Sequence, residues 1–427
     1  MGESVTLKYA DGKEEVFPVV AGSENEKAMD IGAMRSRTGM ITLDDGYGNT
    51  GSCRSAITYL DGERGILRYR GYPIEDLAAK SRFVEVAYLL MYGELPTEPQ
   101  LNVFSGTLNN SSLIHEDMRH FFLAFPNNAH PMSILTTMVA SLSAFYPVPD
   151  EPTDDEEGQI IANLVSQVRT IAAFSYKKFI GEPAVYPSYK LRFVENFLHM
   201  MFSSPVRNYQ QDPDIVKAID TFLILHADHE QNCSTSAVRI TGSSLANVYA
   251  VISAGIAALW GRLHGGANQS VINMLDSIRK AGDDGRRFIE QAKSDKRTRL
   301  MGFGHRVYKT FDPRAMIMKE LCHKLLAKPG MADPMFDIAM RLEAAALSDD
   351  YFLSRNLYPN VDFYSGLILK ATGIPYDMFT VLFAIGRMPG WIANFKEVID
   401  SKDKIYRPRQ IYTGATKRSY EAIDHRK

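Results

Sequence analysis

The sequence predicts a mainly α-helical protein with two helical domains and a small N-terminal segment rich in β-strands. Apolar residues recur at helical spacing from Pro73 almost to the C-terminus, whereas before that point they alternate in short runs divided by glycines. At 427 residues and 45% apolar content, the chain is long enough to bury more than one hydrophobic core. No internal repeat or low-complexity tract interrupts this pattern.

Two small β-structures are expected in residues 1–72. Apolar and polar residues alternate over 5–20 about an Asp-Gly turn, which is the pattern of a β-hairpin. Residues 40–72 are rich in glycine and carry short β-branched runs, which indicates a second strand region around Asp61-Gly62.

Eight helices are expected between Pro73 and the glycine-rich turn that follows His264. Clusters of Pro, Gly or Asn interrupt the helical spacing and mark where one helix ends and the next begins. The last of the eight is apolar around almost its whole circumference, so we expect it at the centre of the core. The expected ranges are 73–92, 97–108, 112–125, 131–146, 158–180, 190–203, 213–230 and 243–260.

Beyond residue 266 the expected helices are shorter and more charged, which indicates a smaller and more solvated domain. They are predicted at 267–281, 285–294, 312–327 and 334–347, before helices at 378–386 and 390–400 rejoin the first domain. The predicted organisation is a β-rich segment at 1–72, a large helical domain of 73–269 and 376–427, and a small helical domain of 270–375.

Charge and composition exclude several classes of protein. The formal net charge is −2, so no basic excess points to nucleic acid. The three cysteines are too few and too scattered for a disulfide framework or a cysteine-based zinc site, which suits a reducing compartment. The N-terminal stretch carries neither an apolar signal core nor an Arg-rich transit helix, and the longest uncharged run is dotted with small residues. We therefore expect a cytoplasmic protein with no membrane partner.

The loop around Gly302 and Gly304 is the first candidate site. Both glycines lack a Cβ, so the backbone between them can adopt positive φ or approach a ligand closely. That freedom would present the His305 ring and bare N–H groups to a cleft. An ordinary surface loop is the alternative interpretation.

Asp312 and Pro313 predict the start of a helix, because aspartate caps helix N-termini and proline is favoured at the first helical position. Arg314 then falls in the first turn, where a positive charge is unfavourable for the helix. We therefore expect an anion to face Arg314, supplied by the protein or by a ligand.

His264 and Asp362 extend the candidate site. His264 directly precedes two glycines, and Asp362 lies among bulky apolar and aromatic neighbours that would raise its basicity. Two histidines and a carboxylate on separate loops can remove a proton from carbon while they polarise a carbonyl. Each residue alone also fits a capping or core role.

A metal site is the competing interpretation of the histidines. His226 and His229 are three residues apart within the expected helix 213–230 and would lie on one face. The pattern is not HExxH, and no cluster of further ligands accompanies it. Histidine pairs on helices are more often hydrogen-bonded core or substrate groups, so we expect no metal.

Four segments, in this order and spacing, resemble those of citrate synthases: HADHEQNCSTS from His226, HGGAN from His264, GFGHRVYKTFDPR from Gly302 and PNVDFYSG from Pro359. The resemblance covers essentially the whole chain, and the third segment is specific to this family and its close relatives. It implies the mainly α-helical, two-domain citrate synthase fold. The N-terminal β-segment and residues 55–78 resemble the longer form of Gram-negative bacteria, which is typically a hexamer built from dimers.

The resemblance implies a transferase of the tricarboxylic acid cycle that condenses acetyl-CoA with oxaloacetate and hydrolyses the product to citrate and CoA. Asp362 would remove a proton from the acetyl methyl group, while neutral His264 would donate a hydrogen bond to the thioester oxygen. His305 would polarise the ketone of oxaloacetate and protonate the new alkoxide. His229 would hydrogen-bond oxaloacetate, and Ser234 matches a helper serine near the thioester.

Three arginines match the carboxylate-binding positions of the family: Arg314, Arg387 and Arg407. A guanidinium suits this role because its planar fork pairs with a carboxylate through two hydrogen bonds. Phe383 matches a ring packed against the substrate. In the family the arginine equivalent to Arg407 reaches in from the neighbouring subunit, which implies a homo-oligomer with a dimer as its minimum unit and a hexamer as a trimer of dimers.

The CoA contacts implied by the resemblance involve the backbone of 301–306 and the cations Arg306 and Lys309, which fit solvated surface charges equally well. No dinucleotide fingerprint, P-loop or metal motif is present, so no cofactor is expected besides the CoA thioester substrate.

Two alternatives stay open at the level of sequence. A 2-methylcitrate synthase would use propionyl-CoA with the same catalytic groups, and the longer N-terminal form favours citrate. A catalytically silent scaffold is opposed by the complete set of histidines, aspartate and arginines.

Long-form relatives that NADH inhibits hold the nucleotide with an Arg-His pair before one helix and with an Arg and a Lys on a later helix. Alignment by flanking residues places Asn110, Ser111, Asn163 and Gln167 at those positions. None is a cation, and hydrogen bonds from charged donors are about twice as strong as neutral ones. We therefore expect an enzyme of this allosteric family that NADH does not inhibit, unless other residues such as Arg169 make the phosphate contacts.

Overall fold

The computed structural model describes residues 2–295, 297–402 and 404–426. Contacts divide the chain into two compact units, of which one comprises Met1–Arg54 with Tyr406–Lys427 and the other comprises Ser55–Ile405. The mainly α-helical fold is confirmed. Among the described residues, every named helix except α1 (Met34–Thr38) and η3 (Ile423–His425) belongs to the second unit, which also contains the hydrophobic core. The predicted boundaries near 72, 269 and 375 stay predictions.

The first unit contains the predicted hairpin. Strands β1 (Ser4–Lys8) and β2 (Glu14–Ala21) pair antiparallel, and β3 (Lys27–Met29) pairs with the end of β2. The guanidinium of Arg37, on the short helix α1 (Met34–Thr38), lies 5.9 Å from the ring centre of buried Phe17. The first unit also holds a 3₁₀ turn, η3 (Ile423–His425).

A second small sheet opens the larger unit, as expected around Asp61-Gly62. Strands β4 (Thr58–Asp61), β5 (Ile66–Tyr69) and β6 (Tyr72–Pro73) form an antiparallel sheet in that order. Its turn packs directly on a distant loop: Lys309 N donates to Gly62 O at 2.9 Å, and a Cβ added to Gly62 would lie 2.2 Å from Val307 O.

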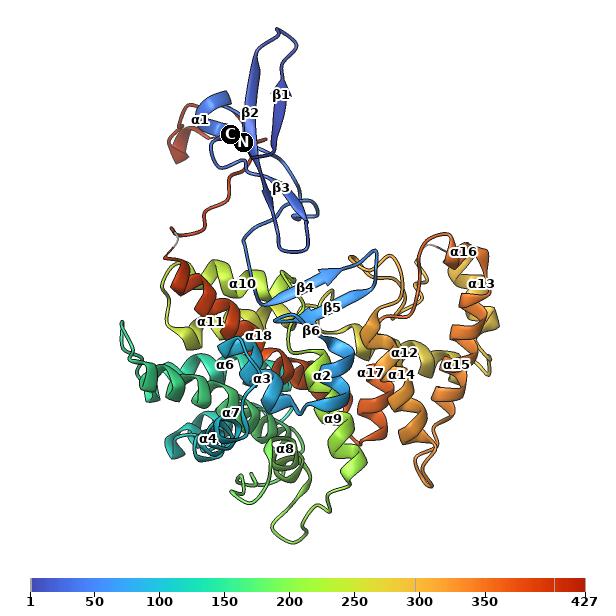
Figure 1. Ribbon diagram of the computed structural model, residues 1–427. Coiled ribbons are helices and arrows are strands. Elements are labelled where there is room, and N and C mark those ends of the chain that lie inside the picture. Colours follow the sequence, from blue (N-terminus) through green and yellow to red (C-terminus); the bar gives the residue numbers. More distant parts are fainter. Residues whose placement is uncertain (1, 296, 403, 427) are drawn as a thin grey trace. The chain divides into compact units, whose positions relative to one another are not determined.

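Helices make up the rest of the larger unit (Figure 1). The first group is α2 (Ile74–Lys80), α3 (Phe83–Tyr92), α4 (Glu98–Asn110), η1 (Glu116–Met118), α5 (Arg119–Ala124), α6 (Pro131–Phe145), α7 (Asp154–Phe179), α8 (Phe193–Phe202), α9 (Pro213–Leu225), α10 (Cys233–Gly242) and α11 (Val248–Leu259). The second group lies together on the right of Figure 1 and is α12 (Ala267–Lys280), α13 (Arg286–Ser294), α14 (Pro313–Leu326), α15 (Pro334–Leu347), α16 (Asp350–Leu353) and α17 (Val361–Ala371). The chain then returns through η2 (Tyr376–Met378) and α18 (Phe379–Ser401).

Several helix boundaries differ from the expected ones. The expected helix 73–92 is interrupted at Ser81, and the expected helix 213–230 ends at Leu225. Helix α10 was not expected, because its Ser- and Thr-rich sequence has a weak apolar pattern. The two helices expected at 378–386 and 390–400 are one, since Pro389 lies inside continuous helix α18. Tertiary packing overrides these local signals.

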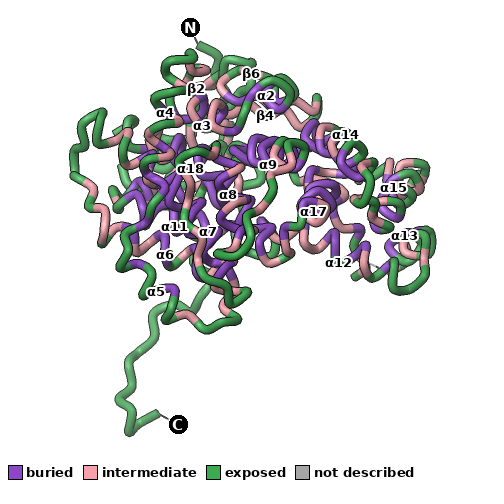
Figure 2. The backbone as a smooth tube through the Cα atoms, turned by 90° about the horizontal axis from the view of Figure 1, so that it is seen from below, coloured by how far each residue is buried: buried purple, intermediate pink, exposed green. Residues whose placement is uncertain are grey.

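Helix α18 is buried along most of its length and lies at the centre of the larger unit (Figures 1 and 2). Gly386 and Gly390 let the end of α9 and the turn after it approach its backbone. A Cβ added to Gly390 would lie 2.3 Å from Ala227 O, and one added to Gly386 would lie 3.1 Å from Leu223 O. These two small residues therefore set how closely the turn after α9 approaches α18.

Within the described residues, no helix combines the length and the hydrophobicity that crossing a bilayer requires.

Replacing Gly390 by alanine is expected to destabilise the protein by about 1–3 kcal/mol, because the added methyl group forces the backbone of the turn after α9 to move. Urea unfolding measures this loss. Gly158→Ala is the matched control: Gly158 lies in helix α7 with open space around its Cα, so alanine should leave stability unchanged or raise it by up to about 1 kcal/mol. Equal effects of the two substitutions would contradict the packing argument.

Candidate active site

The glycine-histidine loop is held in its conformation by the segment that precedes α17. Gly302 and Gly304 have φ of 78° and 76°, as the loop prediction required. A Cβ at Gly302 would lie 2.9 Å from the Cα of Phe363. Gly304 N donates to Tyr358 O at 2.8 Å, and Asn360 N donates to Gly302 O at 2.9 Å. The loop therefore has one defined backbone path.

His305 has a defined tautomer in this loop. Its Nδ1 accepts hydrogen bonds from the backbone N–H of Val307 at 3.0 Å and of Tyr308 at 3.3 Å. Burial and the nearby charge of Arg314 lower the pKa of His305 to about 4. The ring is therefore neutral at pH 7, with its proton on Nε2, where it can be donated to a ligand.

The anion expected to face Arg314 is Asp312. The Asp312 carboxylate caps helix α14 by accepting from Arg314 N at 3.0 Å, and it accepts from Arg314 Nε at 3.0 Å and Nη2 at 2.9 Å. It also accepts from Val361 N at 3.1 Å, at the start of α17. Asp312 and Arg314 are both buried. One carboxylate thus joins the first turns of α14 and α17.

Asp362 lies in the first turn of α17 rather than on the loop that we expected. The helix begins here because the side chain of Asn360 accepts from Asp362 N at 3.0 Å. Burial raises the pKa of the Asp362 carboxyl to about 6, although the charges of Arg314 and Arg387 act in the opposite direction. A carboxylate of this kind is ionised at pH 7 and yet basic enough to accept a proton from a weak acid.

His264 lies in a turn between α11 and α12 whose backbone is hydrogen-bonded to α18. Thr380 donates to Gly265 O at 3.0 Å, and a Cβ at Gly265 would lie 2.5 Å from Leu259 O. His264 Nε2 lies 3.3 Å from Ser234 N, which donates to it, and 2.9 Å from Ser234 Oγ. Burial, helped by the charge of Arg387, lowers the pKa of His264 to about 4. The neutral ring therefore carries its proton on Nδ1.

The histidines at 226 and 229 do not share a helix face, because α9 ends at Leu225 and both follow it. His226 Nδ1 lies 2.7 Å from Phe222 O, and the two rings stack with centroids 4.0 Å apart. His229 Nε2 lies 3.3 Å from the Tyr308 hydroxyl, and its ring centre is 5.3 Å from that of His305. Burial holds the pKa of both imidazoles well below the usual value. No group of three or more potential metal ligands occurs in the described parts of the chain.

Phe383 and Arg387 lie one turn apart on α18 and face the same site. Arg387 Nε donates to His226 O at 2.6 Å, and the guanidinium lies 4.9 Å from the ring centre of Phe383. Its Nη1 is buried without a partner among the described residues. Burial lowers the pKa of Arg387 to about 10, so it stays charged at pH 7. A buried cation with a free donor is suited to an anionic ligand.

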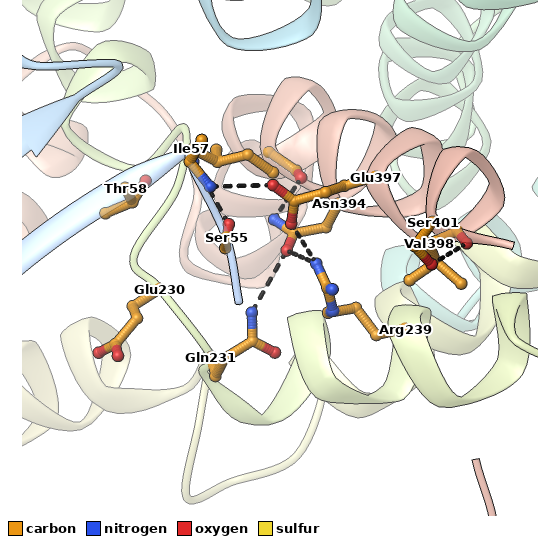
Figure 3. A network of polar contacts seen from close by, with 12 residues as sticks. Ser55, Ile57, Thr58, Glu230, Gln231, Arg239, Asn394, Glu397, Val398 and Ser401 are labelled. Atoms are coloured by element: carbon orange, nitrogen blue, oxygen red, sulfur yellow. Dashed lines mark hydrogen bonds and ion pairs between the residues drawn. The ribbon is translucent and has the colours of Figure 1, made fainter. Parts of the chain in front are cut away.

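A polar network that the sequence did not indicate joins α18 to α10 and to the segment before β4 (Figure 3). Arg239 Nη1 donates to Asn394 Oδ1 at 3.0 Å and to Glu397 Oε2 at 2.7 Å, and Ala56 N donates to Glu397 Oε1 at 2.9 Å. Buried Asp228, beside the site, accepts from Thr58 Oγ1 at 2.6 Å. These are ordinary surface residue types in the sequence, and only the fold brings them together.

The remaining predicted residues are placed differently. Ser234 is buried in the first turn of α10, next to His264. Arg306 and Lys309 are exposed beside the glycine-histidine loop, and Lys309 Nζ donates to Arg306 O at 3.3 Å. Arg407 is exposed and belongs to the first unit, so the larger unit by itself contains two of the three predicted arginines.

The chemistry available at this site follows from its electrostatics. The charges of Arg314 and Arg387 both act on Asp362 and on His229, which places the two cations, the carboxylate and the imidazole in one electrostatic environment. Two neutral imidazoles with assigned donor nitrogens and one carboxylate of raised pKa can remove a proton from carbon and stabilise the oxygen that becomes negative. Buried arginines suit a substrate that carries carboxylates.

Comparisons with known proteins agree with one another. A family model described as "Citrate synthase, C-terminal domain" matches residues 46–409. "Citrate synthase 1" of Mycobacterium tuberculosis is 52% identical over 427 residues, which cover 99% of each chain. The crystal structure of citrate synthase from Pyrobaculum aerophilum superposes with a TM-score of 0.81 at 34% identity, covering 99% of this chain and 100% of the other. The structure of citrate synthase from Thermoplasma acidophilum is described as a ternary complex with carboxymethyl coenzyme A and oxaloacetate. It superposes with a TM-score of 0.83 at 32% sequence identity, covering 90% of this chain and 100% of the other.

Asp312→Ala is expected to destabilise the protein by about 3–5 kcal/mol, because it leaves the buried guanidinium of Arg314 without its anion. Chemical unfolding monitored by circular dichroism measures the change. Asp76→Ala is the matched control, since it removes an exposed ion pair with Lys80 on helix α2, and such pairs contribute about 1 kcal/mol or less. A loss at Asp312 no larger than at Asp76 would show that the buried pair does not hold α14 and α17 together.

Proposed function

The chain belongs to the citrate synthase family, and from this premise we propose how its buried site performs the family's reaction. The protein is an acyltransferase that condenses acetyl-CoA with oxaloacetate and hydrolyses the product to citrate and CoA. The observation that supports our assignment of roles is the raised pKa of Asp362 within the field of two buried arginines, whose charges also act on the neutral rings of His264 and His305.

In the first step Asp362 accepts a proton from the methyl group of acetyl-CoA. The electron pair left on carbon moves toward the thioester oxygen, which becomes an enolate oxygen. His264 donates a hydrogen bond to that oxygen from Nδ1, because its Nε2 is already the acceptor for Ser234. A neutral imidazole is the appropriate donor here, since its own acidity is close to that of an enol.

In the second step the enolate carbon attacks the ketone carbon of oxaloacetate. His305 donates from Nε2 to the ketone oxygen and supplies the proton for the alkoxide, because Nδ1 is occupied by two backbone donors. Arg314 and Arg387 hold the carboxylates of oxaloacetate, His229 adds a hydrogen bond, and Phe383 packs against the substrate. Water then cleaves the thioester, which releases citrate and CoA; Asp362 gives up to solvent the proton that it accepted, and His305 regains from solvent the proton that it gave to the alkoxide.

The pH profile of thiol release from acetyl-CoA tests the role of Asp362. A base acts only when deprotonated, so kcat/KM for acetyl-CoA should be constant above pH 7 and fall as the pH drops through about 6, the raised pKa of Asp362. Asp362→Asn should lower kcat by about 10²–10⁴-fold. Oxaloacetate binding, followed calorimetrically, should change little and serves as the control. Full turnover by the Asn variant would remove Asp362 from the mechanism.

Propionyl-CoA in the same assay addresses the nearest alternative. The similar proteins reported above are citrate synthases, which does not favour a 2-methylcitrate synthase. We therefore expect a higher kcat/KM for acetyl-CoA.

Three further features remain proposals. Arg306 and Lys309, exposed beside the glycine-histidine loop, are suited to the phosphates of CoA. We propose that no resident cofactor takes part, because the proposed acid, base and anion-binding roles are all filled by side chains. We also propose that the protein acts in the cytoplasm.

We propose a dimer, assembled further into a hexamer, in which Arg407 completes the site of the neighbouring subunit. The support is that the larger unit supplies two buried arginines, whereas Arg407 lies exposed in the first unit. A dicarboxylate substrate with a ketone between its carboxylates is held more firmly by three cations than by two.

Mixed dimers test this shared site. Arg407→Ala and Asp362→Asn subunits are each expected to be inactive alone. When they are mixed in equal amounts, about a quarter of the native activity should appear, since half of the dimers are mixed and each has one complete site. Mixing Arg407→Ala with the Arg407→Ala/Asp362→Asn double variant is the control and should restore nothing. No recovery in confirmed mixed dimers would refute sharing.

We also propose that NADH does not inhibit this enzyme allosterically. The four residues that replace the expected cations are neutral, and three of them bond to neighbouring groups: Gln159 Nε2 lies 2.8 Å from Ser111 Oγ and 2.9 Å from Asn163 Oδ1, and Gln167 Nε2 lies 3.1 Å from Leu113 O. Arg169, the possible substitute, is fully buried and donates to Ser112 Oγ at 2.6 Å.

Titration with NADH at low acetyl-CoA checks this proposal. We expect at most weak inhibition that acetyl-CoA overcomes competitively, because a pyrophosphate finds no free cation at the allosteric position. Placing cations there, as Asn163→Arg/Gln167→Lys, is expected to strengthen NADH binding. Cooperative inhibition of the native enzyme that Asn163→Ala abolishes would contradict the proposal.

A further inference from the structure

Trp391 is a buried residue that neither the sequence motifs nor the proposed mechanism used. It lies on α18 one turn after Arg387 and two turns after Phe383, so the three side chains project from one face of the helix. The indole is fully buried. Its Nε1 lies 3.2 Å from Ser234 Oγ, and it donates a hydrogen bond to that oxygen.

Ser234 Oγ stands between Trp391 and His264. Besides the indole, it lies 2.9 Å from His264 Nε2 and 2.8 Å from Asn232 Oδ1. An indole N–H can only donate, so it takes one acceptor position of the hydroxyl. The single hydroxyl proton then has two acceptors within reach, the imidazole nitrogen and the Asn232 amide oxygen.

The indole has little freedom to move. A Cβ added to Gly255 on α11 would lie 3.2 Å and 3.3 Å from atoms of the Trp391 ring and 2.7 Å from Val238 Cγ2 on α10. The ring is therefore packed closely against α11, whose neighbour α10 carries Ser234 in its first turn. The N–H consequently points at Ser234 in a direction that packing determines.

We propose that Trp391 is a positioning residue for the reaction: its indole N–H holds the Ser234 hydroxyl in place beside His264 Nε2, which supports the orientation of an imidazole whose tautomer the backbone N–H of Ser234 assigns. This inference rests on the proposed role of His264. The indole N–H donates to the hydroxyl oxygen, the hydroxyl proton has Asn232 Oδ1 and His264 Nε2 within reach, and each bond in such a chain polarises the next. In this proposal Trp391 acts on the reaction through Ser234.

Trp391→Phe removes the donor and keeps most of the ring. The expected result is a fall in kcat of about two- to tenfold, the usual effect of one hydrogen bond, with an unchanged KM for oxaloacetate. The same substitution in a Ser234→Ala background should cause no further fall, because the residue through which Trp391 acts is gone. Trp260→Phe, at the partly exposed end of α11, is the matched control and should leave kcat unchanged.

An isosteric replacement keeps the test decisive if Trp391→Phe is unstable. The chain has two tryptophans, so the experiment uses a Trp260→Phe background in which only residue 391 is tryptophan. Benzothienylalanine at that position replaces the indole N–H by sulfur and keeps a bicyclic ring of nearly the same shape. It should reproduce the kcat loss at an unchanged Tm. An unchanged kcat, or an equal loss with and without Ser234, would overturn the inference while leaving native turnover, and hence the proposed function, intact. Absent turnover in the native enzyme would instead refute the proposed function.

Discussion

The buried carboxylate of Asp312 is the constraint on which the rest of the site depends. It caps α14, pairs with the side chain of Arg314, and accepts the first free N–H of α17. Because α17 carries Asp362 in its first turn, the guanidinium of Arg314, proposed to bind substrate, and the proposed base take their positions from the same two oxygen atoms. Charge-assisted hydrogen bonds in a buried environment are strong and directional, so these positions are coupled rather than set independently.

Much of the fold and part of the candidate site could be predicted from local signals in the sequence, whereas the roles of His229, Ser234, Phe383 and Arg387 were expected only from the family resemblance. Helical spacing places most helices, Asp312-Pro313 marks the start of α14, and the glycines of the 302–305 loop have the positive φ that only glycine adopts easily. The anion facing Arg314 was also expected from a local argument, since a cation in the first turn of a helix needs compensation. Its source, an aspartate two residues away, was not predicted.

What could not be predicted depends on segments that are distant in sequence. Trp391 and Asn394 read as ordinary helix residues until α18 is packed against α10 and the turn after α9. Helix α9 ends at Leu225, because Arg387 of α18 donates to His226 O and Gly390 brings the helix backbone against the turn. The helical pattern of the sequence continues past Leu225, but a contact between residues far apart in the chain ends the helix there. Arg387 and His226, which make this contact, are 161 residues apart.

The contact between the β4–β5 turn and the loop after His305 has a consequence for how the chain reaches its native state. Lys309 N bonds to Gly62 O, so the turn meets its partner only after almost 250 further residues have been added. During synthesis from the N-terminus, the β4–β5 turn is therefore made long before its partner, and the glycine-histidine loop makes this contact only when the two segments are brought together across a long span of chain. The candidate site thus depends on a contact of long sequence separation, of the kind that closes slowly because a long loop must be ordered first.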